Sequence, residues 1–265
     1  MHAFNLGKVE NIPLGSISRV DTLISEPIGV FLVHERMIES YLYARDHFLK
    51  PISQGGKMYP SHGSIFVAPF TDANIWTQTM AKARFWEQTL FYGVDLSPLF
   101  QDAMDEAFGQ PVVGGFDYRL LMAEGIPFTF DFQTMSIDEL KEFVIPFSWT
   151  MTYTGIIHGL ASWFDITLGD RVLSTSPHLE RTHWHQIRLI IKEPVAVNIG
   201  DVVHGNIHFK VNNMRSYDIN LKIQMGNIVR TGKYLLHEQS YYFDAPNYQG
   251  DVTPEQMGLY ENLSR

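Results

Sequence analysis

The pattern that most restricts the fold is an alternation of apolar and polar residues, which dominates the chain from Phe116 onward. A period of two is typical of strands that bury one face. The clearest examples have an apolar residue at every second position, namely Ile219, Leu221, Ile223 and Met225, and Ile207, Phe209 and Val211. Turn residues bound the latter segment at Gly200-Asp201 and Asn212-Asn213. Several such strands predict an antiparallel sandwich or barrel.

The N-terminal part has a different pattern, of strand, loop and helix. Residues Val20 to Ile24 form a short apolar run that predicts a buried strand leading into a loop. From Met37 to Leu49 the apolar residues recur at helical spacing, and Pro51 ends the expected helix. Gly55-Gly56 then predicts a turn. We therefore expect a short α/β segment before the alternating region.

Two further helices are expected between these parts. Thr71-Asp72 is a suitable N-cap for a helix from Ala73 to Gln88, which carries too many large apolar side chains for a free surface helix. A second helix is expected from Leu99 to Phe108, ending at Gly109. The pair fits either an arm that projects toward a partner subunit or an ordinary helix pair within the chain.

Composition excludes several classes of function. The 265 residues contain no cysteine, which excludes disulfides, thiolate metal sites and a cysteine nucleophile and favours a reducing compartment; we expect no metal. A net charge of -9 disfavours binding to nucleic acid and suits a basic polypeptide partner. No apolar run approaches the roughly 20 residues that span a bilayer, and the opening MHAFNLGKVEN does not resemble a signal peptide. We expect a protein that is neither secreted nor membrane-bound.

Glu26 and Glu35 are the strongest candidates for chemistry. They are nine residues apart, on either side of an apolar stretch that could turn back as a hairpin. A loop that leaves the carboxyl end of a strand in a parallel α/β sheet lies over the ligand crevice, so the two carboxylates could converge there. From spacing alone, two solvated loop charges are the more common outcome.

Several separated motifs resemble the protein arginine methyltransferases. Ser25-Glu26-Pro27-Ile28-Gly29, followed by Glu35-Arg36-Met37, resembles the double-glutamate loop of that family, and Thr182-His183-Trp184 resembles its threonine-histidine-tryptophan loop. Other segments resemble the coactivator-associated branch: Gly93-Val94-Asp95-Leu96, Gln110-Pro111-Val112-Val113, His158-Gly159-Leu160-Ala161, Trp163-Phe164-Asp165 and Ser216-Tyr217-Asp218-Ile219. The resemblance runs from about Gly7 to Phe243.

The resemblance implies a fold and a division into parts. Residues 1–57 would be the C-terminal remnant of a Rossmann-like methyltransferase domain. Residues 58–243 would form an antiparallel β-barrel that binds substrate, with an inserted helical dimerisation arm at about 72–115. Residues 244–265 are polar and are expected to be a loose tail.

The same resemblance implies transfer of methyl groups from S-adenosylmethionine to arginine side chains of histones and other proteins, giving asymmetric dimethylarginine. Glu26 and Glu35 would hold the guanidinium, and His183 would complete the pocket wall by hydrogen bonding or by helping a proton leave. Glu10, Met37 and Ser40 would contact the donor. Without the resemblance, these residues are ordinary: a packed or surface histidine, a loop acid, a core side chain and a helix-face hydroxyl.

Partners and location follow from the resemblance as well. We expect histone tails as substrates, a homodimer formed through the helical arm, and a role in chromatin and transcription regulation in the nucleus, with a cytoplasmic pool. One alternative is a catalytically silent module that pairs with a full-length enzyme through its barrel and arm. A weaker alternative is a general ligand-binding barrel without a role in methylation.

The chain departs from the family in three ways. The family's glycine-rich donor loop should precede Gly7, and Gly55-Gly56 and Gly114-Gly115 are isolated pairs, so we expect poor donor affinity and impaired activity from this chain alone. His34 stands where the coactivator-associated enzymes carry an amide, which would alter how the arginine is hydrogen-bonded. With few neighbouring strands, the strand near Val20 to Ile24 is expected to be partly unpaired.

Overall fold

The alternating region forms two packed sheets. In the computed structural model, which describes residues 7–242, the first sheet is antiparallel throughout, in the order β12-β11-β10-β6. Its strands are β6 (Glu142–Thr150), β10 (Val202–Val211), β11 (Tyr217–Met225) and β12 (Ile228–Leu235). The apolar residues of the predicted alternation, such as Ile219, Leu221 and Ile223, are buried, while their polar neighbours face outward.

The second sheet is mixed. Its order is β13-β4-β9-β7-β3-β5, and β8 pairs with the far end of β7. Only β13 and β4 run parallel. The strands are β3 (His62–Phe70), β4 (Val112–Gly114), β5 (Ile126–Asp131), β7 (Gly155–Leu168), β8 (Arg171–Ser174), β9 (Gln186–Val197) and β13 (Ser240–Tyr241).

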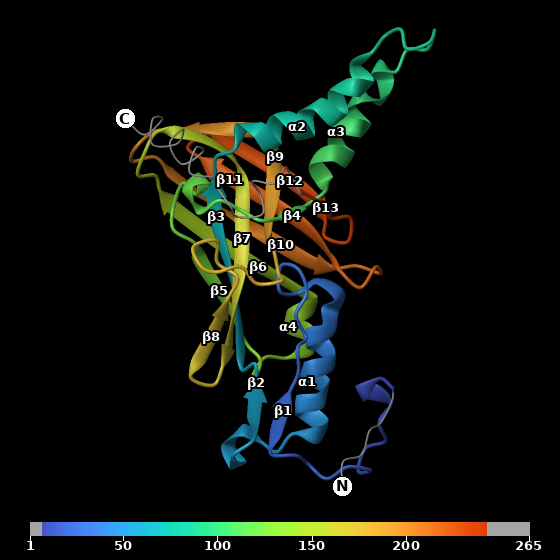
Figure 1. Cartoon of the computed structure of the whole chain (residues 1–265), viewed down its shortest axis with the longest axis vertical. Coiled ribbons are helices and arrows are strands. Elements are labelled where there is room, and N and C mark those ends of the chain that lie inside the picture. Colours follow the sequence, from blue (N-terminus) through green and yellow to red (C-terminus); the bar gives the residue numbers. More distant parts are fainter. Residues whose placement is uncertain (1–6, 243–265) are drawn as a thin grey trace.

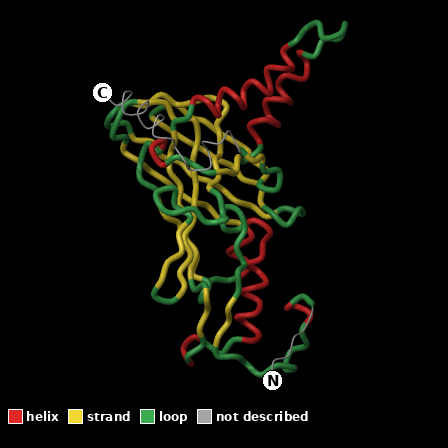
Figure 2. The backbone as a smooth tube through the Cα atoms, in the orientation of Figure 1, coloured by secondary structure: helices red, strands yellow, loops and turns green. Residues whose placement is uncertain are grey.

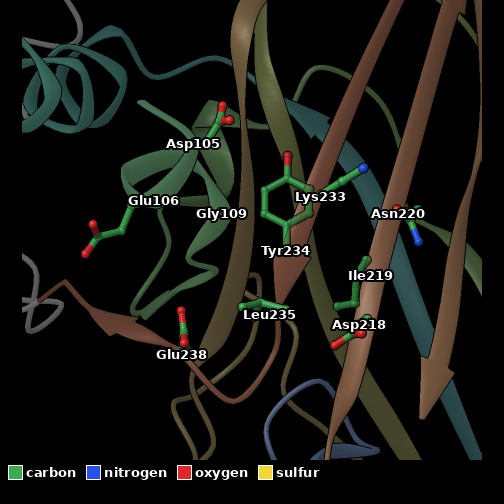
Figure 3. A pocket seen from close by; sticks show the side chains of 10 residues that line it. All are labelled: Asp105, Glu106, Gly109, Asp218, Ile219, Asn220, Lys233, Tyr234, Leu235 and Glu238. Atoms are coloured by element: carbon green, nitrogen blue, oxygen red, sulfur yellow. The ribbon is translucent and has the colours of Figure 1, made fainter. Parts of the chain in front are cut away.

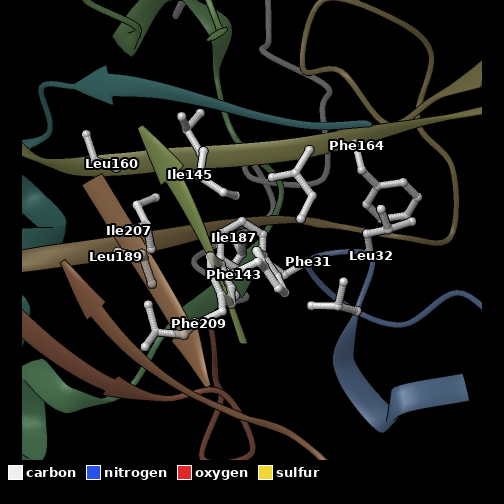
Figure 4. Packing of buried hydrophobic residues seen from close by; sticks show 14 of the residues in the cluster. Phe31, Leu32, Phe143, Ile145, Leu160, Phe164, Ile187, Leu189, Ile207 and Phe209 are labelled. Atoms are coloured by element: carbon white, nitrogen blue, oxygen red, sulfur yellow. The ribbon is translucent and has the colours of Figure 1, made fainter. Parts of the chain in front are cut away.

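The facing sides of these sheets enclose one large apolar core (Figure 4). The rings of Phe143 and Phe209 stack with their centroids 4.6 Å apart. At one side, the Tyr234 hydroxyl on β12 donates to the carbonyl of Ile190 on β9, 2.9 Å away. No strand ladder closes the two sheets into a barrel within residues 7–242. The expected barrel is therefore open.

Two local features explain this opening on the side where β5 leads to β6. Between these strands the chain forms the short helix α4 (Ile137–Lys141), which begins with a reciprocal cap between Ser136 and Glu139. β6 also contains Pro146, which has no backbone N–H to donate and so suits an edge strand.

The N-terminal part is a small parallel pair beside a helix. β1 (Thr22–Ile24) pairs with β2 (Lys57–Tyr59), and α1 (Met37–Phe48) lies alongside (Figure 1). The prediction that this strand is buried was wrong. Ile24 is 75% exposed, because β1 pairs with only one strand, β2. This agrees with the expectation that the strand would be partly unpaired.

Helix α1 is fastened to the second sheet by polar contacts. The Arg45 guanidinium donates to the carbonyls of Phe132 and Met135 at 2.8 and 2.7 Å. The hydroxyl of Tyr41 donates to the carbonyl of Pro60 at 2.8 Å. These contacts hold the N-terminal part against the sheets.

The loop between β1 and α1 also enters the core. Phe31 and Leu32, at its tip, are buried, and the ring centroid of Phe31 lies 5.1 Å from that of Phe209 on β10 (Figure 4). Both residues adopt the left-handed backbone region, with φ of 57° and 65°. The tip of this loop therefore connects the N-terminal part to the centre of the sheets.

The predicted helix pair projects from the sheets (Figures 1 and 2). α2 (Ala73–Arg84) is capped by Asp72, as predicted, but ends at Arg84 and continues only as a 3-10 turn at Phe85–Glu87. α3 (Phe100–Gly109) follows a 3-10 turn at Ser97–Leu99. The indole of Trp76 donates to the carbonyl of Ile191 on β9 at 3.1 Å, so the base of the pair packs within the chain while its far end extends outward.

Two expectations remain outside these observations. The tail expected at 244–265 lies outside the described residues, and the boundaries at 57 and 243 stay predictions. In residues 7–242, no helix has both the length and the apolar character needed to cross a bilayer.

Candidate functional site

Glu26 and Glu35 lie on the two sides of one closed hairpin. The Gly29 amide donates to the carbonyl of Leu32, and the His34 amide donates to the carbonyl of Val30, each at 3.1 Å. The two sides approach so closely that a Cβ on Gly29 would lie 2.2 Å from the carbonyl oxygen of His34. Both carboxylates are exposed. The hairpin predicted from the sequence is confirmed, and it leaves both acids accessible.

The backbone of this hairpin is strained. Glu35 and Arg36 have φ of 68° and 56°, and Phe31 and Leu32 share the left-handed region. Non-glycine residues seldom adopt this conformation, and it persists where surrounding contacts enforce it. The only other non-glycine residues with positive φ in the described part of the chain are Tyr92 and Arg215. Four of these six residues therefore lie in the stretch from Phe31 to Arg36, and Arg215 lies in the loop that contacts this stretch.

That contacting loop connects β10 to β11. Nδ1 of His34 lies 2.9 Å from the Ser216 hydroxyl, and Nη1 of Arg36 donates to the Asn212 carbonyl at 3.4 Å. Arg36 also grips Glu39 with two hydrogen bonds of 2.7 and 3.0 Å. Partial burial lowers the pKa of His34, against an opposing effect of Glu35, so the neutral imidazole is favoured near pH 7.

Of the three residues expected to contact the methyl donor, Glu10 and Ser40 lie next to each other. The Ser40 hydroxyl, in the first turns of α1, donates to the Glu10 carboxylate, and this hydrogen bond is the main reason why the pKa of Glu10 is lowered. Glu10 belongs to a 3-10 turn at Val9–Asn11 that lies against α1. Met37 begins α1 and is half-buried. Nothing in the spacing of Glu10 and Ser40 predicts that they are hydrogen-bonded to each other.

His183 is exposed and lies on the loop before β9. Its ring packs on the neighbouring Trp184 ring, with the centroids 3.6 Å apart. The Thr182 hydroxyl accepts from the Trp184 amide at 3.2 Å and donates to the Trp184 carbonyl at 3.1 Å. Trp184 in turn packs against the core cluster that contains Phe31 and Leu32. The loop and the acidic hairpin therefore rest on the same core.

No hydrogen bond or ion pair joins Glu26, Glu35 or His183 to another side chain among residues 7–242. The free carboxylates can accept hydrogen bonds from a cation, and a guanidinium has donors in the fork geometry that carboxylates accept. The arrangement suits binding of a guanidinium better than acid-base catalysis on a neutral ligand. Residues 7–242 hold no group of three or more potential metal ligands.

The candidate residues do not line a pocket of about 380 Å³ that lies between α3 and the edge of the first sheet (Figure 3). Four acidic residues and several apolar surfaces line it, from Asp105, Glu106, Gly109, Asp218, Ile219, Asn220, Lys233, Tyr234, Leu235 and Glu238. Asp105 is ion-paired with Lys192, and Asp218 accepts from Asn212 at 2.8 Å. Because none of the candidate residues lines this pocket, it is separate from the hairpin site.

Sequence reasoning missed the supporting loop. Ser216 was noticed only as part of a motif, and nothing in its spacing predicts a contact with His34, 182 residues away. Asn212 was interpreted as a turn residue, yet its side-chain oxygen accepts from the amides of Met214 and Ser216. A polar residue beside a strand end is a weak signal for such a role.

Comparison with known proteins agrees with this arrangement. Residues 61–227 match the family model of the arginine methyltransferase oligomerization subdomain. The probable histone-arginine methyltransferase CARM1 of Oryza sativa subsp. indica is 40% identical over 250 residues, which cover 89% of this chain and 46% of the rice protein. The histone-arginine methyltransferase CARMER of Drosophila willistoni is 39% identical over 241 residues, covering 89% of this chain and 44% of the fly protein.

A solved structure shows the same fold. It is the Trypanosoma brucei PRMT1 enzyme-prozyme heterotetrameric complex with AdoHcy, which superposes with a TM-score of 0.72 at 26% identity over 86% of this chain and 72% of the matched chain. The chain spans about half the length of its rice and fly relatives. The family match covers more than half of the chain, in the region of the two sheets and the arm. The chain thus belongs to the protein arginine methyltransferase family and is of the coactivator-associated type.

Proposed function

We propose that this chain supplies the arginine-binding part of a protein arginine methyltransferase. The enzyme would transfer methyl groups from S-adenosylmethionine to arginine side chains of histones and other proteins, with asymmetric dimethylarginine as the product. The observation that carries the proposal is the closed hairpin, which presents the unpaired carboxylates of Glu26 and Glu35 on one loop. The relatives named as histone-arginine methyltransferases support the choice of substrate.

The two carboxylates address the main difficulty of the reaction. An arginine guanidinium is protonated at any physiological pH and is a poor nucleophile while its charge is delocalised. Glu26 and Glu35 accept hydrogen bonds from its N–H groups, hold the positive charge toward some nitrogens and aim the remaining one at the methyl group. As the N–C bond forms, the S–C bond of the donor breaks and one proton leaves the guanidinium. His183, exposed on the loop before β9, is proposed to complete the wall of the site or to take that proton.

Glu10, Ser40 and Met37 are proposed to bind the donor. A carboxylate, a hydroxyl and a thioether side chain suit a ligand that carries an ammonium group, hydroxyls and an apolar base. The bonded pair of Glu10 and Ser40 places the polar groups at the start of α1. The donor supplies an electrophilic methyl group when bound, and the AdoHcy named in the Trypanosoma brucei complex is the product of such a transfer. With only these contacts, we expect weak donor binding by the chain alone.

The clamp is tested by calorimetry with a histone-tail peptide that contains one arginine. Glu26→Gln and Glu35→Gln should each weaken binding by roughly 10- to 150-fold, because each removes a charge-assisted hydrogen-bond acceptor worth about 1.5–3 kcal/mol. Glu106→Gln, an exposed glutamate on α3, is the matched control and should bind normally. A peptide with lysine in place of the arginine should bind weakly. Wild-type affinity in both hairpin variants would refute the clamp, and a methyl-incorporation assay would measure turnover.

We also propose a homodimer formed through the helical arm, which is the basis of the alternative function as a silent binding module. The support is the far end of the arm, where Leu90 and Tyr92 are 79% and 93% exposed and Val94 lies beside them. Contiguous exposed apolar groups are typical of protein interaction sites. The family model that describes this region as an oligomerization subdomain agrees.

Light scattering tests the dimer. Leu90→Asp and Tyr92→Asp should shift the chain toward a monomer, because each buries a charge if the interface forms. Val172→Asp, on the exposed strand β8, is the control. A dimer unaffected by either arm variant would exclude this interface. A stable dimer that neither binds donor nor incorporates methyl groups would favour the silent module.

Histone substrates would place the protein in the nucleus with a role in chromatin and transcription regulation, and other substrates would allow a cytoplasmic pool. The support is the printed names of the rice and fly relatives. Fractionation of cells that express the tagged chain would test both locations. Exclusion from the nucleus would contradict a histone substrate.

A further inference from the structure

His34 links the acidic hairpin to the sheets. Its Nδ1 atom lies 2.9 Å from the hydroxyl of Ser216, in the loop between β10 and β11. His34 is half-buried and directly precedes Glu35. The link therefore spans 182 residues of sequence and ends one residue from a proposed clamp carboxylate.

The Ser216 end of the link is rigid. Ser216 is fully buried, its amide donates to the side-chain oxygen of Asn212 at 3.2 Å, and its carbonyl accepts from the Asn212 amide at 2.9 Å. The amide group of the same asparagine donates to Asp218 on β11 at 2.8 Å. A buried hydroxyl held by its own loop is a well-defined anchor for another side chain.

The His34 end needs such an anchor. The two residues that follow it, Glu35 and Arg36, have φ of 68° and 56°, which a chain without supporting contacts leaves readily. The carbonyl of His34 also closes the hairpin against Gly29. When the His34 ring is held in place, the peptide that begins this turn is held as well. The direction in which the Glu35 side chain extends from the backbone is then also fixed.

We propose that His34 is a positioning residue, whose hydrogen bond to Ser216 holds the left-handed turn in the conformation that presents Glu35 to the guanidinium. This inference rests on the proposed function and deepens it. An asparagine places its terminal atoms near the position of Nδ1, so either side chain can reach the same hydroxyl.

The test uses the full chain with five variants: His34→Ala, His34→Asn, His34→Gln, Ser216→Ala and the double variant that combines His34→Ala with Ser216→Ala. Hydrogen exchange of the hairpin amides reports the turn directly, and calorimetry with the single-arginine peptide reports the consequence for binding. His208→Ala is the matched control, because His208 is hydrogen-bonded to Glu142 at 2.7 Å on the outer face of the first sheet.

The Arg36 amide donates to the Val33 carbonyl at 3.2 Å, so its exchange reports the turn. His34→Ala and Ser216→Ala should each speed exchange of this amide by at least threefold and weaken peptide binding by roughly three- to tenfold. The double variant should be no worse than either single variant, because both remove the same bond. His34→Asn should restore both readouts, whereas His34→Gln, whose amide extends beyond the Nδ1 position, should not. If His34 were needed only for packing, the Asn and Gln substitutions would not differ in this way.

Two outcomes would overturn the proposal: additive effects of the two alanine substitutions on exchange, or unchanged exchange and binding in His34→Ala. If His34→Ala binds normally while Glu35→Gln does not, positioning is wrong and the clamp stands. If the wild-type chain does not prefer the arginine peptide to the lysine peptide, the clamp is wrong, and positioning of Glu35 for a guanidinium is overturned with it, whatever the exchange data show.

Discussion

At the scale of single residues, the acidic hairpin depends on close backbone approach. Gly29 is required because any Cβ would meet the His34 carbonyl oxygen at 2.2 Å, well inside contact distance. The sequence places this glycine correctly in the double-glutamate motif but gives no reason for it. The reason is the antiparallel closure that brings residues 29 and 34 together.

Gly29→Ala should therefore lower the free energy of unfolding by about 1–3 kcal/mol, because backbone on both sides of the hairpin must move to admit the methyl group. Chemical denaturation followed by circular dichroism measures the loss. Gly109→Ala is the control, since a Cβ there would lie 3.6 Å from the carbonyl oxygen of Lys233, an ordinary contact. Equal stability of the two variants would show that the hairpin tolerates opening.

Stability should also fall in mild acid. Burial lowers the pKa of His34, His158 and His185 below the ordinary value of 6.5, so between this value and the depressed folded values the unfolded state binds more protons than the folded state. Their contribution is present above pH 6.5 and is lost as pH falls through the folded pKa values. The melting temperature should drop from pH 7.5 to 5.5, and less so in His34→Asn. An equal drop in that variant would show that His34 does not contribute.

At the scale of elements, the start of α2 is fixed by several hydrogen bonds of one residue, Asp72. The Asp72 carboxylate accepts from the amides of Asn74 and Ile75 at 3.0 and 3.1 Å, and its own amide donates to Nδ1 of His158 on β7 at 3.1 Å. Asp72 thus caps the arm and fixes its base to the second sheet.

Asp72→Ala should cost about 1 kcal/mol of unfolding free energy, because two helix amides lose their acceptor. Asp72→Asn keeps an acceptor oxygen and should remain close to wild type. Thermal melts of both variants provide the comparison. A loss of the same size in Asp72→Asn would assign the effect to the carboxylate charge instead of the cap.

The sequence predicted the positions of helices and strands better than it predicted their burial. Alternation located β10 and β11, and Thr71-Asp72 located the start of α2, because these signals are local. The exposure of β1 could not be predicted from its apolar residues, since burial depends on how many strands pair beside it. The helical pattern also ran on to Gln88, although α2 tightens into a 3-10 turn after Arg84.

At the scale of the whole molecule, the hairpin tip joins the N-terminal part to the sheets. Phe31 lies between elements far apart in sequence, in contact with Phe209 of β10 (Figure 4). The same short loop therefore carries the candidate acids on its exposed side and a core contact on its buried side. Such a long-range contact cannot be predicted from local periodicity.

Phe31→Ala should lower the free energy of unfolding by about 3–5 kcal/mol, because it leaves a cavity where the two parts meet. Phe85→Ala, at an exposed position of the arm, should change it by less than about 1 kcal/mol. Denaturant titrations of both variants measure the difference. Similar small losses would indicate that the hairpin tip can leave the core without unfolding the sheets.

Strand β9 also links two distant parts of the molecule. It starts at Gln186, directly after the loop that carries His183. Five and six residues later, roughly 16–20 Å along an extended strand, Ile191 and Lys192 contact Trp76 and Asp105 of the arm. Strand β9 thus connects the helix pair to the loop that carries His183, a residue of the proposed arginine site. A displacement of the far end of the helix pair is therefore expected to move that loop through the backbone of a single strand, which pairs with β7 and, at its start, with β4.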